Sequence, residues 1–254
     1  MKKFALIGNP IQHSLSPELF RKAYPSTTMR YDLMEEDSIE KSIAELKEKG
    51  YSGANVTAPF KEKVMEFVTD PDPISKTIGA SNLIIFDGDR IYGYNTDYLA
   101  VKRMVKEFFL NIAEEKSTPR AIVIGCGGAG KAAALACRDE GLDTIIANRT
   151  EEKAEAFANQ IGTKSLSLSD AENLLRILTL GNPRVKNNLL VVYAIPEDDR
   201  LIDKALLGKA TVIEANYKNP VLNPESGLKW LKYQAVESFR IFTGISPDEN
   251  RMIL

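Results

Sequence analysis

The chain has 254 residues, of which 44% are hydrophobic, enough to bury a core in one large domain or two of ordinary size. Its 33 basic and 35 acidic side chains leave a net charge of −2. The sequence therefore lacks the basic excess with which proteins attract nucleic acid, and we expect no such partner. No apolar run approaches the roughly 18 residues of a membrane span, and the N-terminal run stops at Gly8, too early for a signal peptide.

Cysteine and histidine are scarce. Cys126 and Cys137 do not make a disulfide framework, which favours a reducing, cytoplasmic location. His13, the single histidine, stands beside no Cys or His ligand pattern. We therefore expect no metal site.

Short apolar runs in the first hundred residues predict strands at 4–7 and 29–34, and another that ends near Thr57. Residues 83–86 and 90–92 flank the turn signal Asp-Gly-Asp at 87–89, which predicts a hairpin. With the helices expected between them, these strands form a βα domain.

Helix signals accompany the strands. Ser16 followed by Pro17 is typical of an N-cap with proline at the first helical position, and predicts a helix to about residue 24. Asp37 with Glu40 fits a capping box, and the helix that it begins is expected to stop at Gly50. The apolar positions of this second helix, Ile39, Ile43 and Leu46, fall on one face.

The second half of the chain alternates strand and helix patterns. A helical pattern runs from 97 to about 115, and residues 117–119 break it as a candidate linker. A strand at 120–124, a helix at 130–140 and a strand at 144–147 make a βαβ unit, and runs at 189–192 and 211–213 extend the parallel sheet. A last helix is expected at 228–242.

The predicted fold is therefore α/β with two domains: a βα substrate domain and a Rossmann-like, doubly wound parallel sheet. We expect the first domain to comprise residues 1–98 plus 229–254, because the last helix returns to it. Residues 99–228 form the second.

A glycine-rich fingerprint follows the strand at 120–124 and opens a helix, the context that dinucleotide binding requires. Its small residues allow a tight turn and close approach of backbone N–H groups to a pyrophosphate. The residues concerned are Gly125, Gly127, Gly128, Ala129 and Gly130, with Cys126 as a small filler.

The next strand ends without the acidic residue that holds the ribose 2′-hydroxyl in NAD sites. Asn148, Arg149 and Thr150 stand there instead, with Lys153 nearby. A guanidinium and short polar side chains suit a 2′-phosphate. The sequence therefore predicts NADP as the cofactor.

Polar clusters occupy the predicted strand ends and loops of the first domain, at 14–17, 55–61, 79–82 and 93–97. Each by itself is typical of an ordinary turn or cap. Together they supply hydroxyls, amides, one amine and one carboxylate, which suits a small polyhydroxylated carboxylate.

These motifs resemble the shikimate dehydrogenase family over essentially the whole chain. The shared motifs are S-x-S at 14–16, N-V-T-x-P-F-K at 55–61, G-A-x-N at 79–82, N-T-D at 95–97, the glycine loop, N-R-T at 148–150, and the late Gly227, Gln234-Ala235 and Phe239. The resemblance implies NADPH-dependent reduction of 3-dehydroshikimate to shikimate, by a monomer or homodimer.

By resemblance, Lys61 and Asp97 are the catalytic pair, and their chemistry agrees: ketone reduction needs an acid at the oxygen, which the lysine supplies while the aspartate orients it. The resemblance also implies a substrate-carboxylate site, contacts to the hydroxyls, a substrate-side tyrosine and a glycine facing the nicotinamide. Ser14 and Ser16 would hold the carboxylate, and the hydroxyls would contact Asn55, Thr57, Asn82, Asp97 and Gln234. Tyr217 is the substrate-side tyrosine, and Gly227 is the glycine that would face the nicotinamide.

The chain departs from the family pattern at residues 191–196, where N-A-T-x-x-G is usual, at Glu214, where aspartate is common, and at Leu83, where threonine is usual. The sequence therefore does not predict which residues of this segment contact the nicotinamide. Alternative functions are a quinate/shikimate dehydrogenase with relaxed cofactor use and a catalytically silent NADP-binding module. A folate-type dehydrogenase lacks a pterin-stacking signature.

Overall fold

A computed structural model describes residues 1–111, 118–180, 188–195, 203, 206, 210–220 and 222–254. The chain divides into two compact units. The first unit comprises Met1–Leu99 and Leu231–Leu254, and the second comprises Ala100–Trp230. The chain passes between them inside helices α4 (Thr96–Asn111) and α9 (Pro224–Thr243), not at the break expected for residues 117–119. Residues 112–117, including the expected helix end near 115, lie outside the described part.

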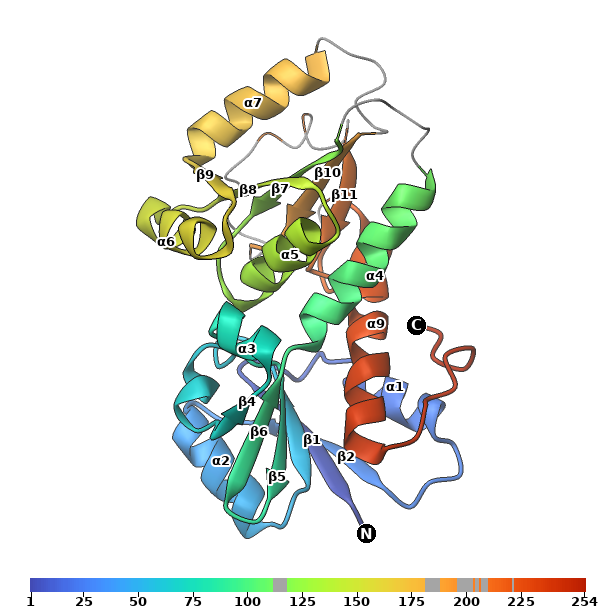
Figure 1. Ribbon diagram of the computed structural model, residues 1–254. Helices are drawn as coiled ribbons and strands as arrows, with labels where there is room; N and C mark the ends of the chain where they lie inside the picture. The colour runs from blue at the N-terminus through green and yellow to red at the C-terminus, as the bar shows by residue number, and fades with distance from the viewer. Residues whose placement is uncertain (112–117, 181–187, 196–202, 204–205, 207–209, 221) are drawn as a thin grey trace. The chain divides into compact units, whose positions relative to one another are not determined.

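The first unit is built on a six-stranded mixed sheet with the order β2-β1-β3-β5-β6-β4 (Figure 1). Parallel pairing of β1 with β2 and β3 puts the carboxyl ends of these strands at one edge, and β5 and β6 form the expected hairpin. The strands are β1 (Lys3–Gly8), β2 (Arg30–Glu35), β3 (Gly53–Val56), β4 (Asp70–Pro71), β5 (Leu83–Asp87) and β6 (Arg90–Tyr94).

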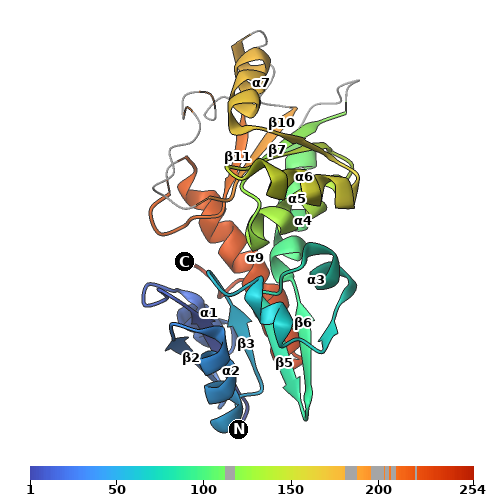
Figure 2. The same ribbon diagram turned by 90° about the vertical axis from the view of Figure 1, so that its left-hand side faces the viewer.

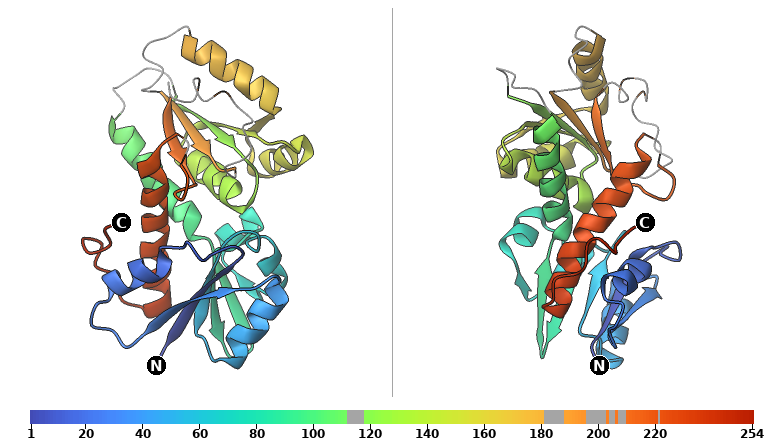
Figure 3. Two further views of the ribbon diagram at one scale, coloured as in Figure 1. Left: turned by 180° about the vertical axis from the view of Figure 1, so that it is seen from behind. Right: turned by 90° about the vertical axis from the view of Figure 1, so that its right-hand side faces the viewer.

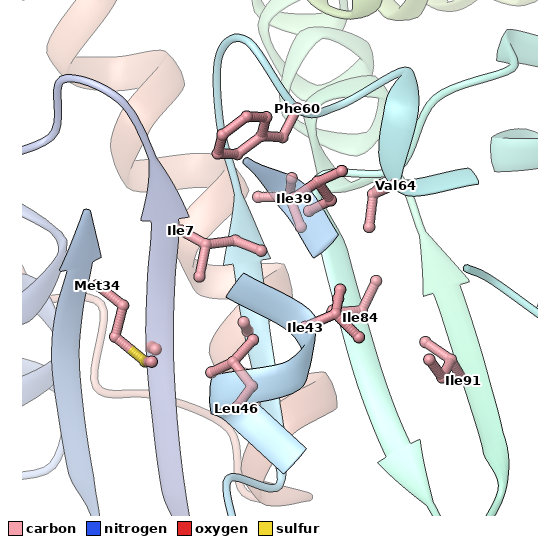
Figure 4. Close-up of a cluster of buried hydrophobic side chains, with 12 residues drawn as sticks. Ile7, Met34, Ile39, Ile43, Leu46, Phe60, Val64, Ile84 and Ile91 are labelled. Atoms are coloured by element: carbon pink, nitrogen blue, oxygen red, sulfur yellow. The ribbon is translucent and has the colours of Figure 1, made fainter. Parts of the chain in front are cut away.

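Helix α2 (Ile39–Glu48) covers one face of this sheet. Its apolar residues pack on Ile7 and Ile84 from the strands (Figure 4), so the predicted apolar face is confirmed. The predicted capping box is wrong by one residue: Ser38 is the N-cap, and its side chain accepts a hydrogen bond from the N–H of Lys41. Gly50 has a φ of 64°, as expected for the residue after a helix end.

Aromatic side chains from helices α1 (Ser16–Ala23) and α9 pack together with those of β1 and β2. Phe4 stacks on Phe242, with ring centroids 4.5 Å apart, and Phe20 meets Phe239 edge-on at 5.0 Å. The C-terminal helix therefore returns to the first unit, as predicted (Figures 1 and 2). Ser16 is not the N-cap of α1: Leu15 takes that position, and Ser16 begins the helix.

The second unit contains a five-stranded parallel sheet with the order β11-β10-β7-β8-β9 (Figure 3). From β7 the chain winds outward to β8 and β9, then returns to the other side of β7 for β10 and β11. With right-handed crossovers, this doubly wound order puts α5 and α6 on one face and α7 on the other. The strands are β7 (Arg120–Ile124), β8 (Asp143–Ala147), β9 (Lys164–Leu166), β10 (Leu189–Tyr193) and β11 (Thr211–Glu214).

Helices α5 (Gly128–Asp139), α6 (Glu151–Ile161) and α7 (Leu168–Leu180) follow β7, β8 and β9. Leu175 of α7 packs on Ile122, Ile124 and Val191, which confirms the predicted Rossmann-like sheet. Helix α5 begins at Gly128, earlier than the expected residue 130, because the glycine loop itself forms its first turn. Two short helical segments of the first unit, η1 (Lys63–Glu66) and α3 (Pro73–Ile78), are not evident in the sequence pattern.

Candidate active site

Lys61 and Asp97 are hydrogen-bonded, with 2.6 Å between Lys61 Nζ and Asp97 Oδ2. Lys61 lies in the loop that follows β3, and Asp97 lies in the first turn of α4. The side chains are 18% and 6% exposed, so water screens this ion pair only weakly. The predicted pair is therefore in contact, and the carboxylate oxygen fixes the position of the lysine amine.

The segment 80–82 holds both partners of this pair. Its Ser81 N–H donates to the carbonyl oxygen of Lys61 at 2.9 Å. Asn95, which precedes α4, donates from Nδ2 to the carbonyl oxygen of Ala80 and accepts the N–H of Tyr98 at Oδ1. The loop of the lysine and the helix of the aspartate are thus tied to one segment.

Asn82 connects this segment to the start of α4. Its Oδ1 accepts the N–H of Thr96 at 2.7 Å, and its Nδ2 donates to Thr96 Oγ1 at 3.0 Å. Gln234 of α9 approaches the same group, with its Oε1 3.5 Å from Asn82 Nδ2. The structure therefore brings Asn82 and Gln234 together beside the residue that precedes Asp97.

Asn55, at the end of β3, belongs to the same buried network. Its Nδ2 donates to the carbonyl oxygen of Asn82 at 3.2 Å and to Ser238 Oγ at 2.9 Å. Its Oδ1 accepts from the Tyr31 hydroxyl at 2.8 Å. Ser238 Oγ also lies 2.9 Å from Thr96 Oγ1, so one chain of hydrogen bonds runs from β2 to α4.

The sequence pattern assigns no role to three residues of this network, Tyr31, Thr96 and Ser238. Thr96 lies within the N-T-D motif. Ser238 follows Gln234 by four residues on one helix, a spacing that puts both on the same face. Tyr31 carries no comparable signal, because a tyrosine in a strand is usually an ordinary core residue.

Ser14 and Ser16 form a separate group at the start of α1. Ser14 Oγ donates to Ser16 Oγ at 3.2 Å and accepts the backbone N–H of Ser16 at 3.3 Å. Thr57 follows β3, and its N–H donates to the carbonyl oxygen of Ile7 in β1. Ser14, Thr57 and Lys61 therefore all lie in loops after the parallel strands β1 and β3, whose carboxyl ends share one edge.

In the second unit, the glycine loop lies at the point where the strand order reverses, between β7 and β10. Gly125 has a φ of 108°, and a Cβ there would lie 2.9 Å from the carbonyl oxygen of Ala194. A Cβ on Gly130 would lie 2.0 Å from the oxygen of Gly125. A Cβ on Gly127, the N-cap of α5, would meet nothing within 4 Å. Two glycines are thus needed for packing, and the third leaves open space at a helix N-terminus, as a bound pyrophosphate requires.

The segment after β8 contacts this loop. Asn148 Oδ1 accepts the N–H of Cys126 at 3.1 Å, which fixes the loop to the end of β8. Arg149 is exposed, and Thr150 is the N-cap of α6 without a side-chain capping bond. Lys153 lies in the first turn of α6, and its carbonyl oxygen is 3.5 Å from Cys126 Sγ. A guanidinium beside a helix N-terminus fits a phosphate group.

The segment that contains Tyr217 is fixed by its neighbours in the second unit. Asn216 Oδ1 accepts the N–H of Lys218 at 3.0 Å, and a Cβ on Gly227 would lie 2.5 Å from the Asn216 oxygen. Glu214, at the end of β11, accepts the N–H groups of Leu222 and Asn223 at 2.8 and 3.0 Å. Gly227 therefore has a packing reason, besides the role that the resemblance implies.

The structure describes residues 191–195 of the segment in which the sequence departs from the family pattern. Tyr193 ends β10 and is buried, and the N–H of Ala194 donates to the oxygen of Ile124. Pro196 lies outside the described residues. No helix among the described residues combines the length and apolarity of a membrane crossing, and within that same part no group of three or more acidic, Cys or His side chains is arranged for a metal ion.

Comparison with known families gives two matches. Residues 6–84 match the model of the shikimate dehydrogenase substrate binding domain, and residues 107–181 match that of shikimate / quinate 5-dehydrogenase.

Curated relatives match along nearly the whole chain. The shikimate dehydrogenase (NADP(+)) of Haloarcula marismortui is 34% identical, over 99% of this chain and 97% of its own. That of Methanococcoides burtonii is 32% identical, over 99% and 96%.

Among solved structures, shikimate 5-dehydrogenase from Thermus thermophilus in complex with NADP(H) and shikimate has a TM-score of 0.77. It is 27% identical, over 99% of this chain and 97% of that one. The shikimate dehydrogenase of Aquifex aeolicus has a TM-score of 0.80 and 26% identity, over 99% and 96%. The motifs, the two units and these matches agree, and the chain belongs to the shikimate dehydrogenase family.

Proposed function

We propose that the chain catalyses the reversible, NADPH-dependent reduction of 3-dehydroshikimate to shikimate, a step toward chorismate and the aromatic amino acids. The observation that carries the proposal is the 2.6 Å hydrogen bond between Lys61 and Asp97. Both residues belong to the unit that contains the matched substrate-binding domain. They supply an acid-base pair beside a set of buried amides.

Ketone reduction needs a hydride at carbon and a proton at oxygen. NADPH supplies the hydride when it is bound. Lys61 Nζ donates the proton to the carbonyl oxygen, and Asp97 Oδ2 orients the amine by accepting one of its hydrogen bonds. In the reverse direction, the neutral amine accepts the proton of the shikimate hydroxyl.

The remaining polar side chains of the first unit would bind the substrate. Ser14 and Ser16 would hold the carboxylate by hydroxyl and backbone donors. The hydroxyls of the ring would contact Asn55, Thr57, Asn82, Asp97 and Gln234, and the resemblance assigns Tyr217 to the substrate as well.

The second unit would bind NADP. Gly125, Gly127, Gly128, Ala129 and Gly130 would receive the pyrophosphate, and Asn148, Arg149, Thr150 and Lys153 the 2′-phosphate. Support comes from the open space at Gly127 and from the exposed guanidinium beside α6. Gly227 would face the nicotinamide.

The expected units follow the same division: residues 1–98 plus 229–254 for substrate and 99–228 for NADP. The protein would act in the cytoplasm as a monomer or homodimer. Gel filtration with light scattering on the purified chain distinguishes the two oligomeric states.

The experiment that tests the function is steady-state kinetics with a panel of substrates. We expect kcat/KM for 3-dehydroshikimate with NADPH to exceed by at least about tenfold the values for 3-dehydroquinate and for NADH. NADH lacks the 2′-phosphate and so loses charge-assisted hydrogen bonds, whereas 3-dehydroquinate brings an additional hydroxyl that needs both space and a hydrogen-bond partner. Comparable values for all pairs would favour a quinate/shikimate dehydrogenase with relaxed cofactor use. Calorimetric binding of NADPH without turnover of either substrate would favour a silent NADP-binding module.

A further inference from the structure

Asn55 is 5% exposed, and its side-chain amide is held on both sides by partners within the first unit. Tyr31 OH approaches Oδ1 at 2.8 Å, and Ser238 Oγ approaches Nδ2 at 2.9 Å. The tyrosine comes from β2 and the serine from α9. Three distant parts of the chain therefore meet at one amide.

The orientation of this amide is set by a backbone carbonyl oxygen, which can accept a hydrogen bond but cannot donate one. The backbone oxygen of Asn82 only accepts, so the group 3.2 Å from it must be the Asn55 nitrogen. Both N–H groups of Asn55 are then used, one by Asn82 and one by Ser238. On the other side, Oδ1 accepts the Tyr31 proton and keeps one lone pair. Asn55 can therefore offer a ligand an acceptor and no donor.

The two clamping hydroxyls also connect Asn55 to the segment of the aspartate. Ser238 Oγ lies 2.9 Å from Thr96 Oγ1, and Thr96 immediately precedes Asp97. Ser238 and Thr96 are fully buried. A shift of the Asn55 amide would therefore move Ser238 and, through it, the hydroxyl of Thr96, which precedes Asp97.

We propose that Tyr31 and Ser238 are positioning residues that clamp Asn55 with only its oxygen available, so that the site selects a substrate hydroxyl that donates at this position. This inference rests on the proposed reduction of 3-dehydroshikimate. A ketone or ether at that position is disfavoured, because neither N–H group of Asn55 is available to it. A missing hydroxyl is disfavoured because it supplies no donor to Oδ1.

The test uses two substitutions that each remove one oxygen, Tyr31→Phe and Ser238→Ala. Each has a matched control in the same unit. Tyr51→Phe removes a hydroxyl that donates to Asp32 at 2.8 Å, and Ser42→Ala removes a fully buried helix hydroxyl that donates to the Ser38 oxygen at 3.0 Å.

We expect kcat/KM for 3-dehydroshikimate to fall about five- to twentyfold in both test variants, mainly through KM, as is usual for one misplaced hydrogen bond. The KM for NADPH of both test variants should stay within about twofold of wild type, and so should kcat/KM of both control variants. Restoring a hydroxyl with Ser238→Thr should recover part of the loss.

The decisive readout uses two analogues of 3-dehydroshikimate that each lack one ring hydroxyl. The variants' loss should disappear with the analogue lacking the hydroxyl that donates to Asn55, and persist with the other. The ratio of the loss in kcat/KM with one analogue to the loss with the other does not depend on the fraction of folded enzyme. Equal losses with both analogues, or variants indistinguishable from their controls, would overturn the clamp. A wild-type enzyme without activity on 3-dehydroshikimate would instead overturn the proposed function, and the clamp with it.

Discussion

Replacing Gly130 with alanine should destabilise the second unit. The new Cβ would lie 2.0 Å from the carbonyl oxygen of Gly125, whereas real Cβ atoms keep at least 3.0 Å, so backbone must move by about 1 Å. Overpacking of this kind costs about 3 kcal/mol, and replacing a helical glycine with alanine returns about 1 kcal/mol. We expect a net loss of about 2 kcal/mol in the free energy of unfolding.

Gly127→Ala is the matched control. Its Cβ would meet nothing within 4 Å, and its φ of −85° and ψ of −175° suit any residue. Urea unfolding followed by circular dichroism should therefore show an unchanged free energy, while fluorescence titration should show NADPH binding weakened at least about tenfold, because the methyl group fills the approach of the pyrophosphate. The reasoning is refuted if Gly130→Ala unfolds like wild type, or if Gly127→Ala binds NADPH normally.

Three further predictions concern single side chains of the second unit. Arg149→Ala should raise the KM for NADPH about ten- to a hundredfold and leave that for NADH unchanged; equal effects would argue against a 2′-phosphate contact. Lys164 and Arg120 lower the pKa of Asp143 below 3.8, so its stabilisation is present above that value and is lost as the pH falls through the lowered pKa. The difference between wild type and Asp143→Asn in urea midpoint should therefore be present at pH 7 and shrink as the pH falls below 3.8, and a constant difference would contradict it. Burial raises the pKa of the Cys137 thiol to about 12, so a thiol reagent at about pH 8 should label this residue only after unfolding; rapid labelling of the folded protein would contradict it.

Much of the fold is predictable because its signals are local. Most strands of both sheets are short apolar runs, and the hairpin follows from Gly88, whose φ is 59°. The sequence pattern does not predict strands β4 and β9, because they are two and three residues long and are not apolar. The family resemblance, confirmed by the matches, depends on motifs that are contiguous in the chain. Helix starts are less predictable, because Asp37 and Ser38 are both good caps and tertiary packing decides between them. The passage between the units lies inside α4 and not at residues 117–119, because one helix can leave a unit and enter the next without a break in its pattern.

The candidate site divides in the same way. Lys61, Asp97 and Asn82 lie in recognisable motifs, and the structure puts them in one hydrogen-bonded group. Tyr31 and Ser238 reach this group only through long-range packing, 24 and 183 residues from Asn55. A sequence pattern reports which polar groups are present, but the partner that saturates each of them is set by the fold.

The central claim is that Lys61 donates the proton that reduction requires. The most direct measurement is kcat for 3-dehydroshikimate with NADPH in Lys61→Ala, compared with Lys63→Ala, which removes an exposed amine two positions along the chain. We expect Lys61→Ala to lower kcat by about 10²–10⁴-fold, the usual effect of losing an acid-base group, and Lys63→Ala to leave it unchanged. Near wild-type turnover in Lys61→Ala would contradict the account.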